Sequence, residues 1–175
     1  MLKCGASCYR PRATFVAEGA HMSTTPTMAP DTGAGALMRR WFQEVWNEGK
    51  ENTIDEMFPR NSVMWGVSRP DASSRGPEEF RAFYQAMRKT FTEMHIELHD
   101  VVQENDTAYG RFSVTANHTG DFFGAAPSGK TIKLVGMCCL KAANGVIVEG
   151  WNVWDQMGLV RELGLLAPQV VAMFP

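Results

Sequence analysis

The sequence predicts an α+β fold in which helices come first and a meandering antiparallel sheet follows. Apolar residues recur at helical spacing as far as Phe91, whereas from Met94 onward they alternate with a period of two. Turn signals at Asn105-Asp106 and Asn144-Gly145 separate consecutive strand-like runs. This order of elements is typical of domains in which helices cover one face of an antiparallel sheet.

Three helices are expected before the strands. The first ends at Gly49, and its buried side comprises Leu37, Met38, Trp41, Phe42, Val45 and Trp46. A short second helix is expected at residues 52–58, with Asn52 as its cap and Pro59 as its stop. The third opens at Pro77 with two acids that favour a helix N-terminus, and its buried stripe comprises Phe80, Phe83, Tyr84, Met87 and Phe91.

Four strands are expected after these helices, at residues 94–104, 107–118, 130–141 and 146–155. Residues 69–76, between the second and third helices, are expected to form a loop. Because the strands follow one another closely in the sequence, we expect each to pair with its neighbour.

The 175 residues suffice for one domain but not for two full cores. We expect a flexible N-terminal arm or leader at residues 1–35, because its second half is rich in Ser, Thr, Pro and Gly without periodicity. Met22 is an alternative start within it. The domain is expected at residues 36–167, followed by a C-terminal tail at residues 168–175.

Charge and composition narrow the classes of partner. Seventeen Lys and Arg against nineteen Asp and Glu give a net charge of -2, which does not favour a nucleic acid or an anionic membrane as partner. No apolar run approaches the roughly 20 residues of a membrane span, and no secretory signal is recognisable. The four cysteines, Cys4, Cys8, Cys138 and Cys139, fit neither a zinc site nor a disulfide framework, so a reducing, cytoplasmic location is expected.

Two motifs match the pattern of a ligand site, but their neighbouring residues argue against a phosphate site in one case and a metal site in the other. Residues 124–131 match the phosphate-binding pattern GxxxxGK[ST], but a strand-like run follows where such a loop needs a helix. His95, Glu97 and His99 share one strand face and offer two imidazoles and a carboxylate to a metal. Because the opposite parity is apolar, these three are expected on a solvated sheet face, and no metal is expected.

Asp155 ends a strand run in which Ile147, Glu149, Trp151 and Val153 share its face. Trp151 and Trp154 flank it, so Asp155 is expected in an apolar surrounding. Such a surrounding disfavours the ionised carboxylate and makes it a better proton acceptor near neutral pH. Capping of a helix at GLVRELG is an equally good interpretation of the same spacing.

His118 shares its parity with Phe112, Val114 and Ala116, so it is expected to face the covered side of the sheet. A buried histidine is more often a hydrogen-bonded core residue than a catalyst, and both roles stay open for His118. Phe122 and Phe123 follow closely, and they either line the mouth of a cavity or cap the core.

Four segments together resemble the SnoaL-like polyketide cyclases, also called ester cyclases, of the nuclear transport factor 2-like (NTF2-like) superfamily. They are RRWFQEVWNEGK at 39–50, GPEEFRAFYQAMRKTF at 76–91, NHTGDFFGAAPSGK at 117–130 and NGVIVEGWNVWDQMGLVRELG at 144–164. The resemblance runs from about Arg40 to Gly164. It implies a cone-shaped fold in which a strongly curved antiparallel sheet wraps helices around an apolar pocket.

The resemblance also implies a reaction. Characterised members close a ring of an aromatic polyketide methyl ester by an intramolecular aldol reaction, without metal or organic cofactor. By position in the WNVWD segment, Asp155 is the expected catalytic acid/base, and His118 is the expected second catalytic group, donating a hydrogen bond. Family members commonly have a histidine, in a strand after the second helix, where this chain has Trp65, and they have an arginine where it has Lys141. A smaller and less polar pocket is therefore expected.

The leading hypothesis is therefore a cofactor-independent cyclase, and its expected substrate-binding residues are Trp46, Trp65, Phe122, Phe123, Trp151 and Trp154. The first alternative is a non-catalytic module that binds an apolar small molecule in the same pocket. The second is an epoxide hydrolase using Arg111, although Ser113 stands where the partner acid is expected. A homodimer or higher homo-oligomer is expected from the resemblance.

Overall fold

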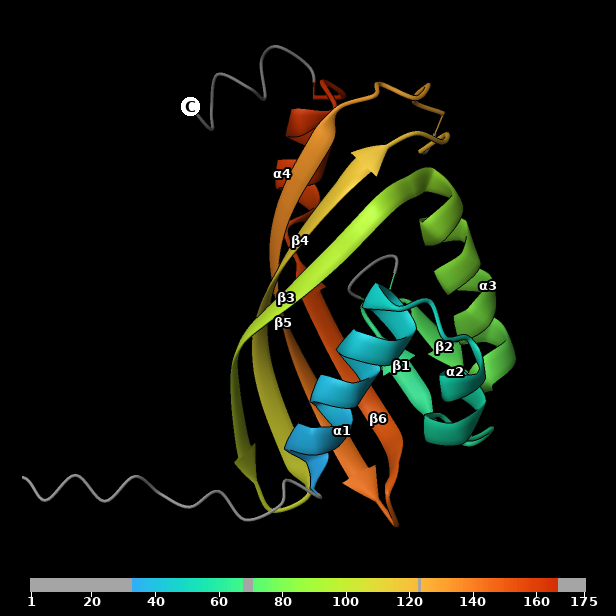
Figure 1. The fold of residues 1–175 in the computed structure, drawn as a ribbon, viewed down its shortest axis with the longest axis vertical. Helices are drawn as coiled ribbons and strands as arrows, with labels where there is room; N and C mark the ends of the chain where they lie inside the picture. Colours follow the sequence, from blue (N-terminus) through green and yellow to red (C-terminus); the bar gives the residue numbers. More distant parts are fainter. Residues whose placement is uncertain (1–32, 68–70, 123, 167–175) are drawn as a thin grey trace, which may run out of the picture.

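A computed structural model describes residues 33–67, 71–122 and 124–166 of the chain. Its centre is one curved sheet of six strands in the order β2-β1-β6-β5-β4-β3. The helices α1, α2 and α3 lie together on the inner side of this sheet (Figure 1). The predicted α+β class and the cone-shaped architecture are therefore confirmed.

The first predicted helix consists of two segments with different hydrogen-bonding patterns. The α-helix α1 (Ala34–Arg40) continues directly into the π-helix η1 (Trp41–Asn47). At its end, Glu48 N–H donates to Gln43 O, five residues back, at 2.9 Å. This wider spacing brings residues five apart to one face. Trp41 and Trp46 accordingly both contact the ring of Phe80, at centroid distances of 4.9 and 6.2 Å.

Asn47 and Arg88 hold η1 between the sheet and α3 (Gly76–Thr90). The side-chain amide of Asn47 donates to Ile96 O at 2.9 Å and accepts from Ile96 N–H at 2.7 Å. On the other side, the Arg88 guanidinium donates to Trp46 O at 3.0 Å. The π-helix is thereby tied to two elements that face each other.

The second predicted helix is α2 (Asn52–Met57), and one expectation about it is wrong. Asn52 does not cap this helix but is its first residue, with Glu51 at the cap position. The Asn52 side chain donates instead to the Glu56 carboxylate at 3.2 Å. In α3, by contrast, Pro77 and the two acids stand in the first turn as predicted.

The four predicted strands are confirmed, with small differences at their ends. They are β3 (Phe91–Glu104), β4 (Thr107–His118), β5 (Thr131–Ala143) and β6 (Val146–Trp154). Each pairs antiparallel with the next. Asn105 and Asn144 adopt φ angles of +52° and +51°, as tight turns at these positions require.

The residue patterns alone do not show two short strands, β1 (Val63–Trp65) and β2 (Ser73–Arg75), although the resemblance placed Trp65 on a strand after the second helix. β1 runs parallel to β6, so the sheet is mixed and not purely antiparallel as expected. Three residues are too few to display a period of two, and β2 falls where a loop was expected. Gly66 follows β1 with φ of +71°, and a Cβ there would collide with the backbone carbonyl oxygen of Asn152.

Beyond β6, the helix α4 (Gln156–Glu162) continues alongside β5. Asp155 N–H donates to Val135 O at 3.0 Å, and Lys133 N–H donates to the Glu162 carboxylate at 3.1 Å. Leu159 is fully buried. The helix therefore covers the part of β5 that β6 leaves unpaired.

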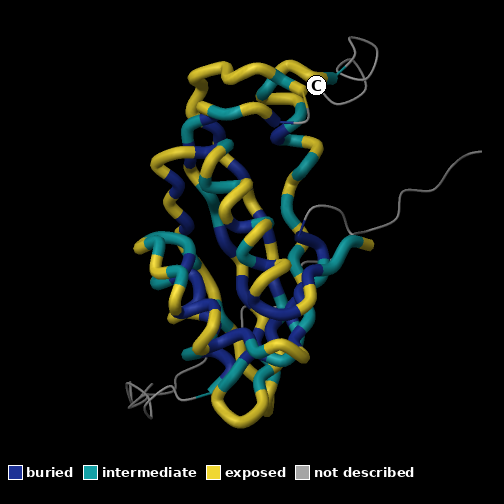
Figure 2. Tube along the Cα trace, turned by 90° about the vertical axis from the view of Figure 1, so that its right-hand side faces the viewer, coloured by how far each residue is buried: buried dark blue, intermediate teal, exposed yellow. Residues whose placement is uncertain are grey.

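The hydrophobic core fills the space between the helices and the sheet, and it includes Phe58, Phe80 and Phe91 as its largest fully buried side chains. In Figure 2 the buried stretches gather in the interior, and exposed stretches lie at the turns and loops at both ends. None of the helices in the described part of the chain is long and apolar enough to span a membrane. The predicted arm and tail fall almost entirely outside the described residues, and their boundaries stay predictions.

Candidate functional site

The main cavity lies between the inner face of the sheet and the helices η1 and α3. Its volume is about 780 Å³, including the part that is open to solvent. The lining residues are Trp41, Phe42, Trp46, Met64, Gly66, Val67, Phe80, Phe83, Met87, Phe91, Met94, Ile96, Phe112, Val114, Ile132, Leu134, Asn152 and Trp154.

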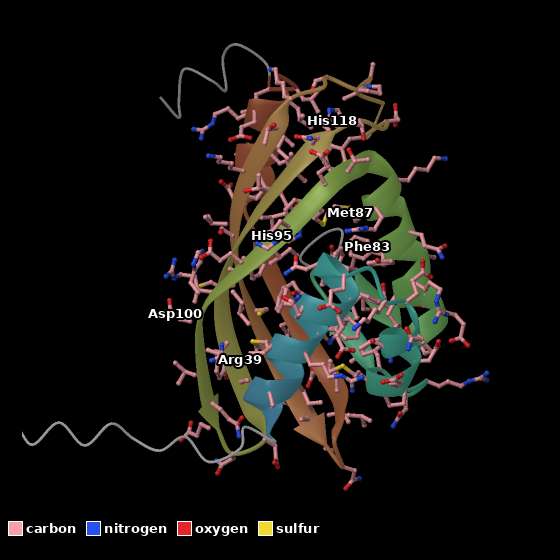
Figure 3. All side chains as sticks on the ribbon, viewed as in Figure 1. Arg39, Phe83, Met87, His95, Asp100 and His118 are labelled. Carbon is pink, nitrogen blue, oxygen red and sulfur yellow. The ribbon has the colours of Figure 1, made fainter. Side chains whose placement is uncertain are left out.

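Helical and strand periodicity explain which side chains reach this cavity. Phe83 and Met87 are four residues apart on α3, and both project toward the sheet (Figure 3). Phe112 and Val114 are two residues apart on β4, so both face inward. The cavity is thus built from two facing surfaces that each follow their own period.

The main cavity is almost entirely apolar. Among its described lining residues, the polar side-chain groups are the Asn152 amide and the indole N–H groups of Trp41, Trp46 and Trp154. The Asn152 amide already donates to Trp65 O at 3.4 Å. The lining therefore suits an apolar ligand and supplies no acid or base.

A second space, the mouth chamber, adjoins the main cavity at the end near the 119–130 loop. Its volume is about 640 Å³, again including open solvent. It is lined by Val67, Phe83, Ala86, Met87, Thr90, Asp121, Phe122 and Trp154, of which Val67, Phe83, Met87 and Trp154 also line the main cavity. Among the described residues lining either space, Asp121 alone has a titratable side chain.

Sequence reasoning did not single out Asp121, although it stands in the HTGDFFG segment between His118 and Phe122. The signal that was available is its position three residues after the inward-facing His118, which ends β4, and beside the aromatic Phe122. Its Oδ1 accepts a hydrogen bond from Gly124 N–H at 3.1 Å. Thr90 Oγ1 donates to its backbone carbonyl at 3.1 Å, which ties the residue to the end of α3.

Asp155 does not lie in an apolar surrounding, and that expectation is wrong. Its side chain is exposed, and Oδ1 accepts the Gly158 N–H at 2.7 Å as the N-cap of α4. Of the two interpretations that the spacing allowed, helix capping is the one the structure shows. Asp155 lines neither the main cavity nor the mouth chamber.

A β-bulge in β6 explains this outcome. Ala142 pairs with Ile147, but Lys141 pairs with Glu149, so Val148 is an extra residue on β6. An extra residue reverses the parity of the strand beyond it. Ile147 is therefore buried, whereas Trp151 and Val153 are 45% and 72% exposed on the outer face.

The same reversal corrects the expected roles of Trp65 and Trp151. Their rings stack on each other at 5.2 Å on the outer side, and neither lines the main cavity or the mouth chamber. Trp151 Nε1–H donates to the Glu149 carboxylate, and this bond, with the nearby Lys141, lowers the pKa of Glu149. Trp65 and Lys141, where the chain departs from its relatives' pattern, thus line neither space, so the expectation that they make the pocket smaller and less polar is wrong.

Three predicted substrate-binding residues do reach the candidate site. Trp46 lines the main cavity, Phe122 lines the mouth chamber, and Trp154 lines both. Phe123 lies outside the described residues. The structure brings these three together from η1, from the loop after β4 and from the end of β6.

His118 faces the covered side of the sheet as predicted, and it is 1% exposed. Its Nδ1 accepts from Ser128 N–H at 3.2 Å and lies 3.0 Å from Ser128 Oγ, so the ring proton resides on Nε2. The described residues offer this buried Nε2–H no partner. The ring packs against Phe91 and Phe122, at 5.5 and 6.5 Å, and does not itself line either space.

The other residues considered for metal binding, phosphate binding or nucleophilic chemistry line neither the main cavity nor the mouth chamber. His99 contacts Ser113 Oγ at 2.9 Å, and the described residues include no cluster of His, Cys, Asp and Glu that could hold a metal ion. Thr131 begins β5, so the GxxxxGK[ST] segment precedes a strand as predicted. Burial raises the pKa of the Cys138 thiol to about 12, which keeps it protonated and unreactive at neutral pH.

Arg111 pairs with Asp100 at 2.8 Å on exposed parts of β4 and β3. Asp100 lies on the outer side of the sheet, away from the helices (Figure 3). Arg111 lines neither the main cavity nor the mouth chamber, so the epoxide-hydrolase alternative has no support in this geometry.

A cone-shaped domain that encloses an apolar cavity is the architecture that the sequence resemblance implied. The family model of the SnoaL-like polyketide cyclases matches residues 36–163. The chain belongs to this family.

Two curated relatives of this SnoaL-like chain are aklanonic acid methyl ester cyclases, DnrD of Streptomyces peucetius and DauD of Streptomyces sp. (strain C5). Each is 23% identical over 129 residues, which is 73% of this chain and 88% or 80% of the relative. Among solved structures, TsrD of Streptomyces laurentii superposes with a TM-score of 0.67, at 24% identity over 79% of this chain and 100% of its own. A SnoaL-like polyketide cyclase of Agrobacterium tumefaciens gives 0.62, at 14% identity over 75% and 98%.

The capping role of Asp155 gives a stability prediction. Replacing Asp155 with Ala removes the acceptor of the Gly158 N–H, so we expect the free energy of unfolding to fall by about 1 kcal/mol. Asp155→Asn retains an acceptor and is expected to cost a few tenths of that. Urea unfolding followed by circular dichroism measures both, and equal stability of the Ala variant and the wild type would contradict the capping role.

Proposed function

We propose that this SnoaL-like chain is a cofactor-independent enzyme that closes a ring in an apolar carbonyl compound by acid/base chemistry of the intramolecular aldol type. The observation that carries the proposal is the apolar main cavity in a chain of this family. The names of the two curated relatives support a methyl ester of an aromatic polyketide as the class of substrate.

The cavity would supply orientation. An aromatic polyketide folded against Trp46, Phe83 and Phe112 loses its freedom to adopt extended conformations. Both reacting carbons belong to one molecule, so holding them close together selects the reactive conformer from the many that the free substrate adopts, which lowers the entropic part of the barrier. The apolar walls provide this by shape and need no charged group.

The chemistry is a balanced rearrangement. A base takes a proton from a carbon between two carbonyl groups, and the resulting enolate carbon forms a bond to a third carbonyl carbon of the same molecule. The alkoxide produced takes up a proton, so the product is an isomer of the substrate. One acid/base group and one hydrogen-bond donor to the enolate oxygen are sufficient.

The roles expected for Asp155 and His118 stay predictions. Asp155 would have to release the Gly158 N–H before its carboxylate could turn toward a substrate. His118 carries a buried Nε2–H that is free to donate, and the ring of Phe91 separates it from the main cavity. The hydrogen bonds of Ser128 to Nδ1 hold this proton on Nε2.

Filling the main cavity tests the proposal. Val114→Phe adds an aromatic ring on the inner face of β4, so we expect ring closure of an aromatic polyketide methyl ester to slow by on the order of 10²-fold as the substrate is displaced. Product formation is followed by liquid chromatography. Val102→Phe, at a 66% exposed position of β3, is the matched control and should react like the wild type. Unchanged turnover in Val114→Phe would contradict catalysis in this cavity.

A binding module is the second candidate function, and one observation favours it. The described residues that line the main cavity include no titratable group, so the cavity is as well suited to holding a ligand as to transforming one. Incubation with the same polyketide ester distinguishes an enzyme from a binding module. Under the binding alternative it is recovered unchanged, while it alters the fluorescence of Trp41, Trp46 and Trp154.

We also propose that two copies of the chain associate through the outer face of the sheet. This face carries exposed apolar side chains, which are Tyr109, Val135, Met137, Trp151 and Val153. Met137 pairs with Val153, and Tyr109 and Trp151 both pair with Cys139, so these side chains form one patch across β4, β5 and β6. An apolar patch of this kind is typical of a protein interface.

Charges in this patch should separate the two copies. With Met137→Glu and Val153→Glu combined, association would bury two carboxylates in each chain, so we expect a monomer where the wild type is a dimer. Size-exclusion chromatography with light scattering measures the mass. Met157→Glu, at an exposed apolar position on α4, is the control and should remain dimeric. A monomeric wild type at tens of micromolar would overturn the proposed dimer.

A further inference from the structure

We infer that Gly136 and Gly150 set the size of ligand that the main cavity accepts, because each gives a lining side chain room to lie against the sheet. The inference rests on the proposed function, in which this cavity holds the substrate. The glycines of the described strands are Gly110 on β4, Gly136 on β5 and Gly150 on β6, and all three are buried. Glycine is a poor strand residue, so its presence at these positions requires a physical reason.

The backbone conformation does not supply this reason. None of these three glycines has a positive φ angle, so a residue with a side chain could adopt the same backbone conformation. The reason is space. A residue without a Cβ lets a neighbouring side chain lie directly on the strand, and a side chain lies in this way on each of the three glycines.

The ring of Phe112 occupies the space above Gly136. The two residues pair across β4 and β5, and a Cβ at position 136 would collide with Cζ of this ring and would lie 2.8 Å from Cε2. Trp154 pairs with Gly136 from the other side, on β6. Phe112 and Trp154 both line the main cavity. Gly136 therefore lies between two lining aromatic residues, and the ring of Phe112 leans across it.

A side chain at position 136 would force this ring toward the cavity. Its Cβ would also lie 2.9 Å from Val153 O, which belongs to the paired backbone of β6 and cannot move as easily as a side chain. Phe42 of η1 packs against the Phe112 ring with the centroids 5.3 Å apart. In a densely packed interior a displaced ring moves toward open space, and the open space beside Phe112 is the main cavity.

Met64 uses Gly150 in the same way. The two residues pair across β1 and β6, and a Cβ at position 150 would collide with Sδ of Met64 and would lie 2.8 Å from its Cε. Met64 also lines the main cavity. A methionine side chain is flexible, so it adapts to crowding more easily than an aromatic ring does. We therefore expect Gly150 to limit the size of the ligand less strictly than Gly136.

Gly110 offers a matched control. A Cβ at this position would lie 2.6 Å from Met38 Sδ and 3.1 Å from Leu98 Cδ1. Neither Met38 nor Leu98 lines the main cavity or the mouth chamber. A methyl group at position 110 would therefore crowd the core as the other two substitutions do, but it would not move a lining side chain.

Binding of two aromatic esters of different size measures the effect without requiring turnover. The probes are methyl naphthalene-2-carboxylate, with two fused rings, and methyl anthracene-2-carboxylate, with three. Tryptophan fluorescence reports the dissociation constant of each. We expect Gly136→Ala to weaken binding of the three-ring ester by about 10-fold or more and to leave that of the two-ring ester within about twofold. Gly150→Ala should show the same selectivity with a smaller loss, and it tests the inference independently if Gly136→Ala does not fold.

Removal of the Phe112 ring should reverse the effect. In the double variant Gly136→Ala, Phe112→Leu no ring is displaced, so the three-ring ester should bind as tightly as it does to Phe112→Leu alone. Gly110→Ala should bind both esters like the wild type, even where its Tm falls as far as that of Gly136→Ala. This comparison distinguishes a loss of space in the cavity from a general loss of stability.

The outcomes separate the size limit from the proposed reaction. Equal weakening of both esters by Gly136→Ala, or wild-type binding of the three-ring ester, would overturn the role of Gly136 while the proposed function stands. An equal loss in the Phe112→Leu background would overturn the displacement of the ring. If the wild type binds both esters but leaves a polyketide ester unchanged, the proposed ring closure is wrong and the size limit stands. A wild type that binds neither ester would overturn both.

Discussion

The cavity exists because η1 is tied to both of its neighbours without filling the space between them. Asn47 binds the backbone of β3, and Arg88 binds the backbone of η1 from α3. The rings of Trp41 and Trp46 then close one wall against Phe80. Atoms that line an open apolar space forgo van der Waals contacts, and filling it recovers them. A fold that maintains such a space among buried aromatic residues is suited to a ligand that completes the packing.

The bulge at Val148 decides which tryptophans belong to this cavity. Without the extra residue, Trp151 would keep the parity of buried Ile147 and face inward. With it, Trp154 reaches the cavity, and Trp151 stacks on Trp65 on the outer face. One residue of register therefore separates two surfaces, an inner surface suited to a small molecule and an outer surface suited to a second copy of the chain.

Long periodic patterns were sufficient to predict α3 and the four strands of the meander, because each repeats its period often enough to be recognised. The period of two could not reveal β1 and β2, because each has only three residues and forms by pairing with another part of the chain. The capping role of Asp155 was one of two readings of its spacing, and only the register of β6 separates them. Asp121 was not selected from sequence, because the tertiary fold determines which residues surround a loop carboxylate, and its position near His118 and Phe122 is a weak signal by itself.

The buried imidazole of His118 links this architecture to the proposed chemistry. A buried N–H without an acceptor costs about 1–3 kcal/mol, yet Ser128 holds the ring in the tautomer that presents one. Phe91 packs against this ring and also lines the main cavity, while Phe122 packs against it and lines the mouth chamber. A buried donor without a partner is the kind of group that can stabilise the oxygen of a forming enolate.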